Sequence, residues 1–206
     1  MAARSEGGKA NPTAGPPPDE VPAATPAVVP EAGWEAVQPL RIEGGRGSFV
    51  SGEPEGDRLR VAYFRRAADG VLVGRAWFGP GAEGPPGHAH GGASAAVLDE
   101  AMGAAAWMEG LVVVAVHLEV DFHRMVPLGT DAWMEARVES VDGRKVVTRG
   151  RLHDAAGDDL ATASGLFLTL DPERFRQLLA RVARAMGVGL DELLEEMRRR
   201  GFRGPR

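Results

Sequence analysis

Two adjacent carboxylates, Asp99 and Glu100, lie in a segment that otherwise consists of small apolar residues, from Ala93 to Trp107. Apolar residues occur at nearly every angle of the helix that this segment predicts, which is typical of a helix buried in a core. Burying a carboxylate costs free energy unless the group is paired or used in chemistry. The pair is therefore the main functional candidate. The alternative for Asp99 is a structural acid held by a backbone N–H or an arginine, and for Glu100 a surface or interface acid is favoured.

A second group of polar side chains lies on a predicted strand, residues 111–123. Four of them alternate with apolar residues and so share one face of the strand. They are His117, Glu119, Asp121 and His123. Neighbours on one face of a strand lie about 7 Å apart, which is wide for a single metal ion. We therefore predict no metal site here, and we interpret this face as a polar or subunit-facing surface.

Turn residues and hydrophobic periodicity define the elements that must position these groups. Alternating patterns predict two strands before the helix and four after it, with turns such as Asp69-Gly70 and Asp142-Gly143 between them. The expected strands cover residues 58–63, 71–77, 111–123, 130–140, 145–153 and 160–170. The helix follows the loop Gly84-Pro85-Pro86-Gly87 and ends near Glu109-Gly110. Asp171-Pro172-Glu173 has the N-cap, first-turn proline and acid of a further helix start.

This order of elements predicts an α+β fold, in which an antiparallel sheet of about six strands wraps around one long apolar helix. Residues 57–170 form the expected domain, and residues 171–206 form a C-terminal helical extension. Residues 1–33 are rich in Pro, Ala and Gly, so we expect a disordered arm. Residues 34–56 are expected to be an irregular lead-in.

The composition disfavours several functional classes. The 206-residue chain carries 24 basic and 29 acidic residues, and its net charge of −5 gives no support for a nucleic-acid partner. It has no cysteine, which excludes disulfides, thiol nucleophiles and Cys-ligated metals. No apolar run reaches the roughly 18 residues of a membrane span, and the N-terminus has no signal-peptide or transit pattern. We expect a cytoplasmic protein.

The motifs around the helix resemble those of the hotdog-fold acyl-CoA thioesterases, specifically the PaaI-like branch. The resemblance covers roughly residues 57–170. The matching motifs are Gly84-Pro85-Pro86-Gly87, His90-Gly91-Gly92, Asp99, Met102-Gly103, Phe122-His123-Arg124, Pro127-Leu128-Gly129 and Gly143-Arg144-Lys145. The resemblance implies a hotdog fold and hydrolysis of an acyl-CoA thioester without a cofactor, since CoA is part of the substrate.

The resemblance also implies roles for individual residues. The backbone N–H of Gly91 would polarise the thioester carbonyl, and Asp99 would activate water or attack directly. Physical chemistry agrees, because a helix N-terminus has unpaired N–H groups and partial positive charge, and burial raises a carboxylate pKa toward a range useful for proton transfer. His90 completes the catalytic set, although a structural role in the turn is favoured for its imidazole. The residues expected to bind CoA are Gly92, His123, Arg124, Gly143, Arg144 and Lys145. For the basic residues among them, ordinary turn charges are the alternative.

Three positions depart from the family pattern. Ala115 stands where relatives often have Ser or Thr, which helps to hold the water. Glu83-Gly84 stands where an Asn or Gln is common, and Arg124-Met125 replaces Arg-Pro. Two hypotheses therefore stay open: an acyl-CoA thioesterase, and a non-catalytic module that binds an acyl group or CoA. A hydratase of the same fold is disfavoured, because the chain has no Asp-x-Asn-Pro-x-His pattern.

Helix geometry predicts that the active site is shared between two chains. Gly91 and Asp99 are eight residues apart, which is about 12 Å along a helix. A carbonyl donor and a base must each lie about 3 Å from the reacting group, so one helix cannot supply both to one thioester. Two antiparallel helices across a twofold axis can. We therefore expect a homodimer with two equivalent sites, with a homotetramer built as a dimer of dimers as the larger alternative.

Overall fold

The computed structural model describes residues 29–37 and 48–199 of the chain. The strands are β1 (Trp34–Ala36), β2 (Leu59–Arg66), β3 (Leu72–Phe78), β4 (Val113–Phe122), β5 (Asp131–Asp142), β6 (Lys145–His153) and β7 (Asp159–Thr169). The helices are α1 (Gly91–Met108), α2 (Pro172–Met186) and α3 (Leu190–Arg199), and Pro80–Ala82 form a short 3-10 turn. Within these residues, no helix combines the length and the apolarity needed to cross a membrane.

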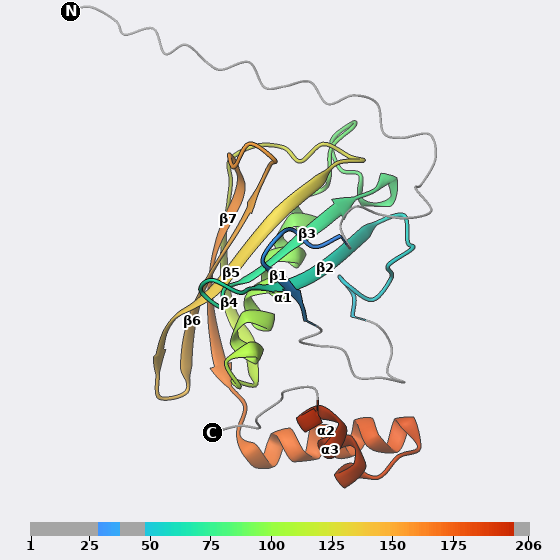
Figure 1. Ribbon diagram of the computed structural model, residues 1–206, viewed down its shortest axis with the longest axis vertical. Coiled ribbons are helices and arrows are strands. Elements are labelled where there is room, and N and C mark those ends of the chain that lie inside the picture. Colours follow the sequence, from blue (N-terminus) through green and yellow to red (C-terminus); the bar gives the residue numbers. More distant parts are fainter. Residues whose placement is uncertain (1–28, 38–47, 200–206) are drawn as a thin grey trace, which may run out of the picture.

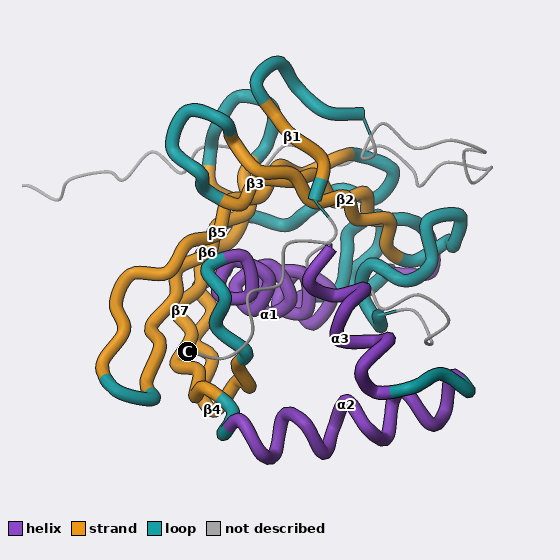
Figure 2. Tube along the Cα trace, turned by 60° about the horizontal axis from the view of Figure 1, so that its bottom comes forward, coloured by secondary structure: helices purple, strands orange, loops and turns teal. Residues whose placement is uncertain are grey.

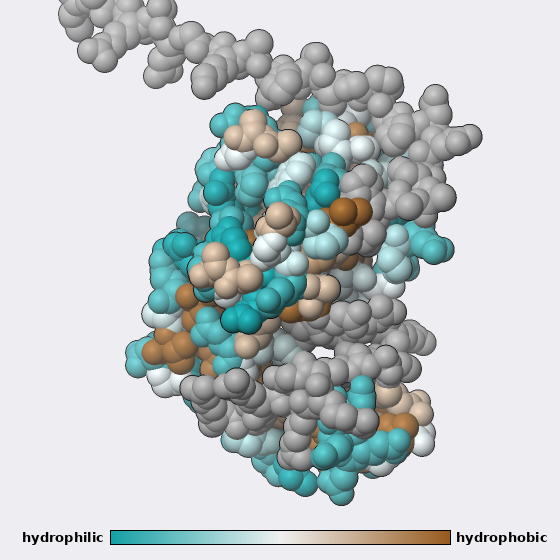
Figure 3. Space-filling view, in the orientation of Figure 1, coloured by the Kyte–Doolittle hydropathy of each residue, from teal (hydrophilic) through white to brown (hydrophobic). Residues whose placement is uncertain are grey.

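The strands form one antiparallel sheet in the order β1-β2-β3-β5-β6-β7-β4, and this sheet curves around α1 (Figures 1 and 2). The predicted α+β arrangement of a sheet wrapped around one helix is confirmed. On the face drawn in Figure 3, the apolar areas are small and separated by hydrophilic surface. The large apolar side chains instead lie mainly between α1 and the sheet.

Strand β1 was not expected from the sequence, which predicts irregular structure over residues 34–56. It pairs with the end of β2 through Trp34↔Arg66 and Ala36↔Phe64. The Trp34 ring packs on Phe64 with 5.4 Å between ring centroids. A strand of three residues is too short to display a period of two, so its pattern carries no signal. The predictions for residues 1–28, 38–47 and 200–206 lie outside the described residues.

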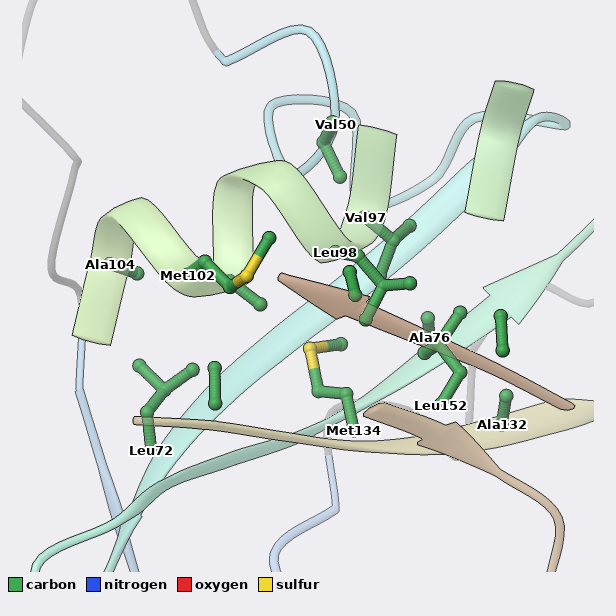
Figure 4. Packing of buried hydrophobic residues seen from close by; sticks show 14 of the residues in the cluster. Val50, Leu72, Ala76, Val97, Leu98, Met102, Ala104, Ala132, Met134 and Leu152 are labelled. Carbon is green, nitrogen blue, oxygen red and sulfur yellow. The ribbon is translucent and has the colours of Figure 1, made fainter. Parts of the chain in front are cut away.

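Helix α1 packs closely on the sheet because both surfaces are built from small or slender side chains. Leu98 and Met102 point from the helix toward the side where Met134 and Leu152 lie (Figure 4). A Cβ atom on Gly150 of β6 would lie 3.1 Å from Met102 and 3.2 Å from Leu98, so glycine permits this approach. The prediction of burial all round the helix holds only in part, because Ala95, Ala96, Asp99 and Gly103 are partly exposed in the single chain.

Strand β4 lies at the edge of the sheet, paired only with β7 among the described strands. The register shifts between Ala115 and His117, so Val116 forms a bulge and is 52% exposed. Beyond the bulge, Leu118 and Val120 pack against the core, while Phe122 is 57% exposed. The predicted apolar face of this strand is therefore covered only in its middle.

Helices α2 and α3 lie beyond one end of the sheet (Figure 1). The predicted N-cap is present, because the Asp171 carboxylate accepts from the N–H groups of Glu173 and Arg174 at 3.0 and 3.2 Å. The apolar sides of the two helices form a second cluster against Trp107 and Val112, at the C-terminal end of α1. The side chains of residues 198–200 lie outside what the structure describes.

Candidate active site

The N-terminus of α1 is formed by a tight loop that ends at His90. A Cβ on Gly84 would lie 2.7 Å from the Cα of His90, so only glycine allows the chain to return this closely. His90 is the N-cap, and its Nδ1 accepts a hydrogen bond from the N–H of Gly92 at 2.9 Å. When Nδ1 accepts, the neutral imidazole carries its proton on Nε2. The position of His90 is therefore that of a structural cap for the helix.

The cap distinguishes the two glycines that follow it. The N–H of Gly92 is bonded to His90, whereas the N–H of Gly91 has no acceptor among the described residues. Gly91 is the first residue of a helix of 18 residues, where unpaired N–H groups and the helix dipole favour negative charge. Of the two, Gly91 is the donor available to a ligand.

A cavity of about 260 Å³ adjoins this donor. Its walls come from the loop before α1, the first turn of α1, the end of β4 with the loop after it, and the start of β7. The lining residues are Pro85, Ala89, Gly91, Ser94, Phe122, His123, Arg124, Met125, Val126, Leu160 and Ala161. The cavity is largely apolar, which suits an uncharged group beside the Gly91 N–H.

Two of the predicted CoA-binding residues line this cavity, but both have protein partners. His123 Nε2 lies 2.9 Å from Thr162 Oγ1. The Arg124 guanidinium donates to the Asp154 carboxylate at 2.9 Å and to the carbonyl oxygen of Asp158 at 2.8 Å. Arg124 thereby fastens the end of β4 to the β6–β7 turn. The two side chains of this ion pair are 28% and 34% exposed, so the Arg124 side chain stays partly accessible.

Asp99 lies two turns further along α1, on its partly exposed side. It is half-buried, and burial raises the pKa of its carboxyl above the ordinary value of 3.8. No described residue donates a hydrogen bond to it, so the structural alternative, an acid held by a backbone N–H or an arginine, has no support within these residues. A carboxylate that is partly desolvated and holds free lone pairs is suited to accept a proton.

Glu100 has a different environment from the one expected for a surface or interface acid. Its carboxylate accepts a hydrogen bond from the buried Tyr63 hydroxyl of β2 at 3.0 Å, and a second bond from the Ser48 hydroxyl. Burial raises the pKa of Glu100, and the Tyr63 bond partly offsets this. The partners are 37 and 52 positions away in the chain. The one available sequence signal was a lone tyrosine in an inward-facing position of β2.

Gly92 lies in the first turn of α1, whereas the three other predicted CoA-binding residues lie near the opposite end of this helix. Gly143, at φ 56°, and Arg144 form the β5–β6 turn, and Lys145 begins β6. The Arg144 guanidinium donates to the carbonyl oxygen of Thr169 at 3.0 Å. Gly143 and Arg144 line a second cavity of about 230 Å³, together with Gly110, Leu111, Val112, Thr169, Leu170, Asp171 and Pro172. Within one chain, the candidate residues therefore form two separate groups, one near each end of α1.

On the polar face of β4, only His123 at its end reaches the cavity beside Gly91. Glu119 and Asp121 line a cavity of about 310 Å³ on the sheet, with Arg137, Glu139, Arg149 and Thr162 among its other walls. Among the described residues, no group of three or more His, Asp or Glu side chains is placed to hold a metal ion. Ala115 lies on the exposed edge beside the bulge and brings no hydroxyl to the site.

Comparison with known proteins gives consistent matches. Residues 86–161 match the family model of the thioesterase superfamily. Acyl-coenzyme A thioesterase THEM4 of Xenopus laevis is 38% identical over 121 residues, which are 58% of this chain and 54% of that protein. Acyl-coenzyme A thioesterase THEM5 of Homo sapiens is 31% identical over 99 residues, 47% of this chain and 40% of that protein. The chain spans about half the length of the curated relatives it matches.

A solved structure extends the match to the fold. The crystal structure of a thioesterase superfamily protein superposes on this chain with a TM-score of 0.55 and 30% sequence identity, covering 69% of this chain and 68% of that one. With the sheet order and the enclosed helix, this confirms the hotdog fold predicted from the sequence.

Proposed function

The chain belongs to the thioesterase superfamily, and from this we propose that it hydrolyses an acyl-CoA thioester to a carboxylic acid and CoA. The observation that carries the proposal is the N–H of Gly91. It is a donor without an acceptor among the described residues, at the positive end of a long helix, beside a largely apolar cavity. A donor in this position stabilises the negative charge that develops on a carbonyl oxygen during acyl transfer.

In the proposed reaction, the thioester carbonyl oxygen accepts a hydrogen bond from Gly91. Asp99 removes a proton from a water molecule as the water oxygen forms a bond to the carbonyl carbon. The C–S bond then breaks, and the CoA sulfur leaves and takes up the proton from the Asp99 carboxyl group. Water and protein groups supply every atom and proton of this sequence, so the proposal requires no cofactor.

The site is proposed to be shared between two chains. Gly91 and Asp99 are about 12 Å apart along one helix, too far to act on the same carbonyl. Support for a partner comes from the partly exposed side of α1, where Gly103 and Ala96 flank Asp99. Further support comes from the open edge of β4, where Val114 and Val116 are exposed. A twofold pairing at this edge brings the first turn of one α1 beside Asp99 of the other.

The same pairing accounts for the two groups of candidate CoA-binding residues. The Gly143-Arg144-Lys145 turn lies near the end of α1 opposite to Gly91. In an antiparallel pair of helices, the opposite end of one chain approaches the Gly91 end of its partner. We propose that Arg144 and Lys145 meet the CoA phosphates from there, with His123 and Arg124 at the cavity itself.

The test of the activity is free-thiol release from a panel of acyl-CoAs by the wild-type chain and two variants at position 91. Gly91→Pro removes the N–H with little other change, because proline suits the first position of a helix and His90 already has the extended backbone that precedes proline. We expect kcat to fall about 10²–10³-fold. Gly91→Ala keeps the N–H, and its Cβ would make an ordinary 3.4 Å contact with Phe122, so its kcat should be nearly unchanged. Binding of CoA by the wild-type chain without thiol release would instead identify a non-catalytic module.

The test of the shared site is a mixing experiment. Asp99→Asn chains and Gly91→Pro chains should each be inactive alone. When they are co-assembled, one of the two sites in each heterodimer combines an intact Gly91 with an intact Asp99, so activity should return. A fully active monomer, or a demonstrated heterodimer without activity, would contradict the shared site.

A further inference from the structure

Ser94 is a buried hydroxyl in the wall of the cavity beside Gly91. The residue is only 3% exposed, and it lies about one helical turn after the Gly91 donor. With aromatic residues set aside, the other described residues that combine a polar or charged side chain with a buried position are Arg60 and Thr148. Both of these are hydrogen-bonded, Arg60 to the carbonyl oxygen of Gly56 and Thr148 to that of Gly165.

The Ser94 hydroxyl differs because it forms no hydrogen bond with any described protein group. A serine inside a helix usually turns to solvent or donates to the carbonyl four residues earlier. Here the hydroxyl lies in the wall of a cavity instead of on the outer surface, and no bond to the His90 carbonyl is formed. The Ser94 oxygen is not among the fully enclosed side-chain atoms that lack a partner, so a group bound in the cavity can reach it. Ser94 is part of the lining of that cavity, and a ligand there can supply the acceptor that the protein does not.

The position of Ser94 relative to Gly91 limits what it can bind. Residues three apart are neighbours on a helix surface, and Ser94 lies about 4.5 Å further along the axis than Gly91. A single oxygen atom held at the first turn can therefore accept from both the Gly91 N–H and the Ser94 hydroxyl. The basic side chains of the cavity lining, His123 and Arg124, are hydrogen-bonded to Thr162 and Asp154, and none of the described hydrogen bonds joins either of them to Ser94.

We propose that Ser94 is a further catalytic residue, whose hydroxyl donates a hydrogen bond to the thioester carbonyl oxygen beside the N–H of Gly91. This inference rests on the proposed function. It adds a side-chain donor to the backbone donor, and both act on the oxygen whose charge grows in the transition state. The Ser94 proton stays on its oxygen throughout, while Asp99 handles the proton of the attacking water.

The test compares Ser94→Ala, Ser94→Cys and a control, Ser164→Ala, in the full chain. Ser164 lies on β7 and lines the cavity on the sheet, away from Gly91. With an acyl-CoA that the wild type hydrolyses, we expect Ser94→Ala to lower kcat about 10²-fold with little change in KM. Ser94→Cys keeps a weak donor on a slightly larger side chain, and its kcat should lie between those of the wild type and Ser94→Ala. The control should match the wild type.

A stability measurement separates this role from a structural one. Removing a hydroxyl without a protein partner should not lower the midpoint of urea unfolding, whereas removing a structural hydrogen bond should lower it. The midpoint of the pH–rate profile should also stay the same, because Ser94 does not titrate. Unchanged kcat in a folded Ser94→Ala chain would overturn the role of Ser94 and leave the proposed function intact. A wild-type chain that releases no thiol from any acyl-CoA would overturn both.

Discussion

The two acids of α1 are neighbours in sequence but lie on faces of the helix with opposite character. Glu100 faces β2 and the segment before it, where Tyr63 and Ser48 donate hydrogen bonds to its carboxylate. Asp99 faces the partly exposed side of the helix, and no described group donates to it. Burial raises the pKa of both carboxyls. Burial alone therefore does not distinguish the two acids. They differ in the supply of fixed donors, which Glu100 has and Asp99 lacks among the described residues.

The largest difference between the two acids is expected when each is replaced in turn by its amide. Asp99→Asn keeps the shape of the side chain but cannot accept a proton, so kcat should fall about 10²–10⁴-fold in a thiol-release assay. Glu100→Gln is the matched control at the adjacent position, and its kcat should stay close to that of the wild type. Circular dichroism would verify that both variants fold. Wild-type rates in a folded Asp99→Asn chain would remove Asp99 from the mechanism.

The pH dependence of the rate gives a second way to distinguish Asp99 from Glu100. As the proposed base, Asp99 can accept a proton only when it is ionised, so below its pKa kcat/KM should fall about tenfold per pH unit. Because burial raises this pKa, the midpoint of the acid limb should lie above the ordinary Asp value of 3.8. Glu100→Gln should retain the acid limb. Loss of the acid limb in the Glu100→Gln variant would mean that the rate depends on the titration of Glu100 and not on that of Asp99.

Ionisation of Asp99 should affect stability and rate in opposite directions: as pH rises, the rate should rise and the stability of the folded chain should fall. A carboxyl whose pKa is higher in the folded than in the unfolded chain makes the folded state bind more protons between the two values, so stability falls as pH rises through that window. At neutral pH, Asp99→Asn should therefore melt at the same temperature as the wild type or higher. This advantage should disappear at pH values below the ordinary Asp pKa.

A smaller effect is expected from removing one donor to Glu100. Tyr63→Phe deletes the hydroxyl and leaves a half-buried carboxylate with one partner fewer, so the free energy of unfolding should fall by about 1–3 kcal/mol. Urea denaturation measures this, with Ser140→Ala on the exposed part of β5 as a control. An unchanged free energy of unfolding in Tyr63→Phe would mean that the Tyr63–Glu100 hydrogen bond does not stabilise the fold, which would contradict a structural role for Glu100.

The smallest effect is expected from a segment remote from both acids. The Pro-, Ala- and Gly-rich residues 1–28 offer no core-forming pattern, and the described contacts begin at Glu31, which accepts from the Trp133 indole. Deleting residues 1–28 should leave the melting temperature and kcat unchanged within error. Deleting residues 1–36 removes β1 and its Trp34–Phe64 contact, and the melting temperature should fall. A clear loss in the shorter deletion would contradict this division.

The parts of the site that the sequence predicts are those that depend on local structure. The start of α1, the cap at Asp171 and the six longer strands follow from patterns within a few residues. The Tyr63–Glu100 bond joins positions 37 residues apart, and no local pattern predicts it. The bulge at Val116 interrupts the alternation predicted for β4. No glycine or other turn residue at this position indicates it in the sequence. The composition of α1 also does not predict which side of the helix is partly exposed, because the same small residues suit burial against a sheet or against another helix.

The bulge has a consequence for the solubility of the chain. An open edge strand with apolar side chains is a template for endless strand addition, the geometry of amyloid fibres. In β4 the bulge breaks the flat ladder after Ala115, and Glu119 and Asp121 place negative charge on the remaining stretch. Bulges and charges at edges are the means by which natural sheets avoid aggregation. The bulge and the charges at this edge therefore discourage the growth of a fibre.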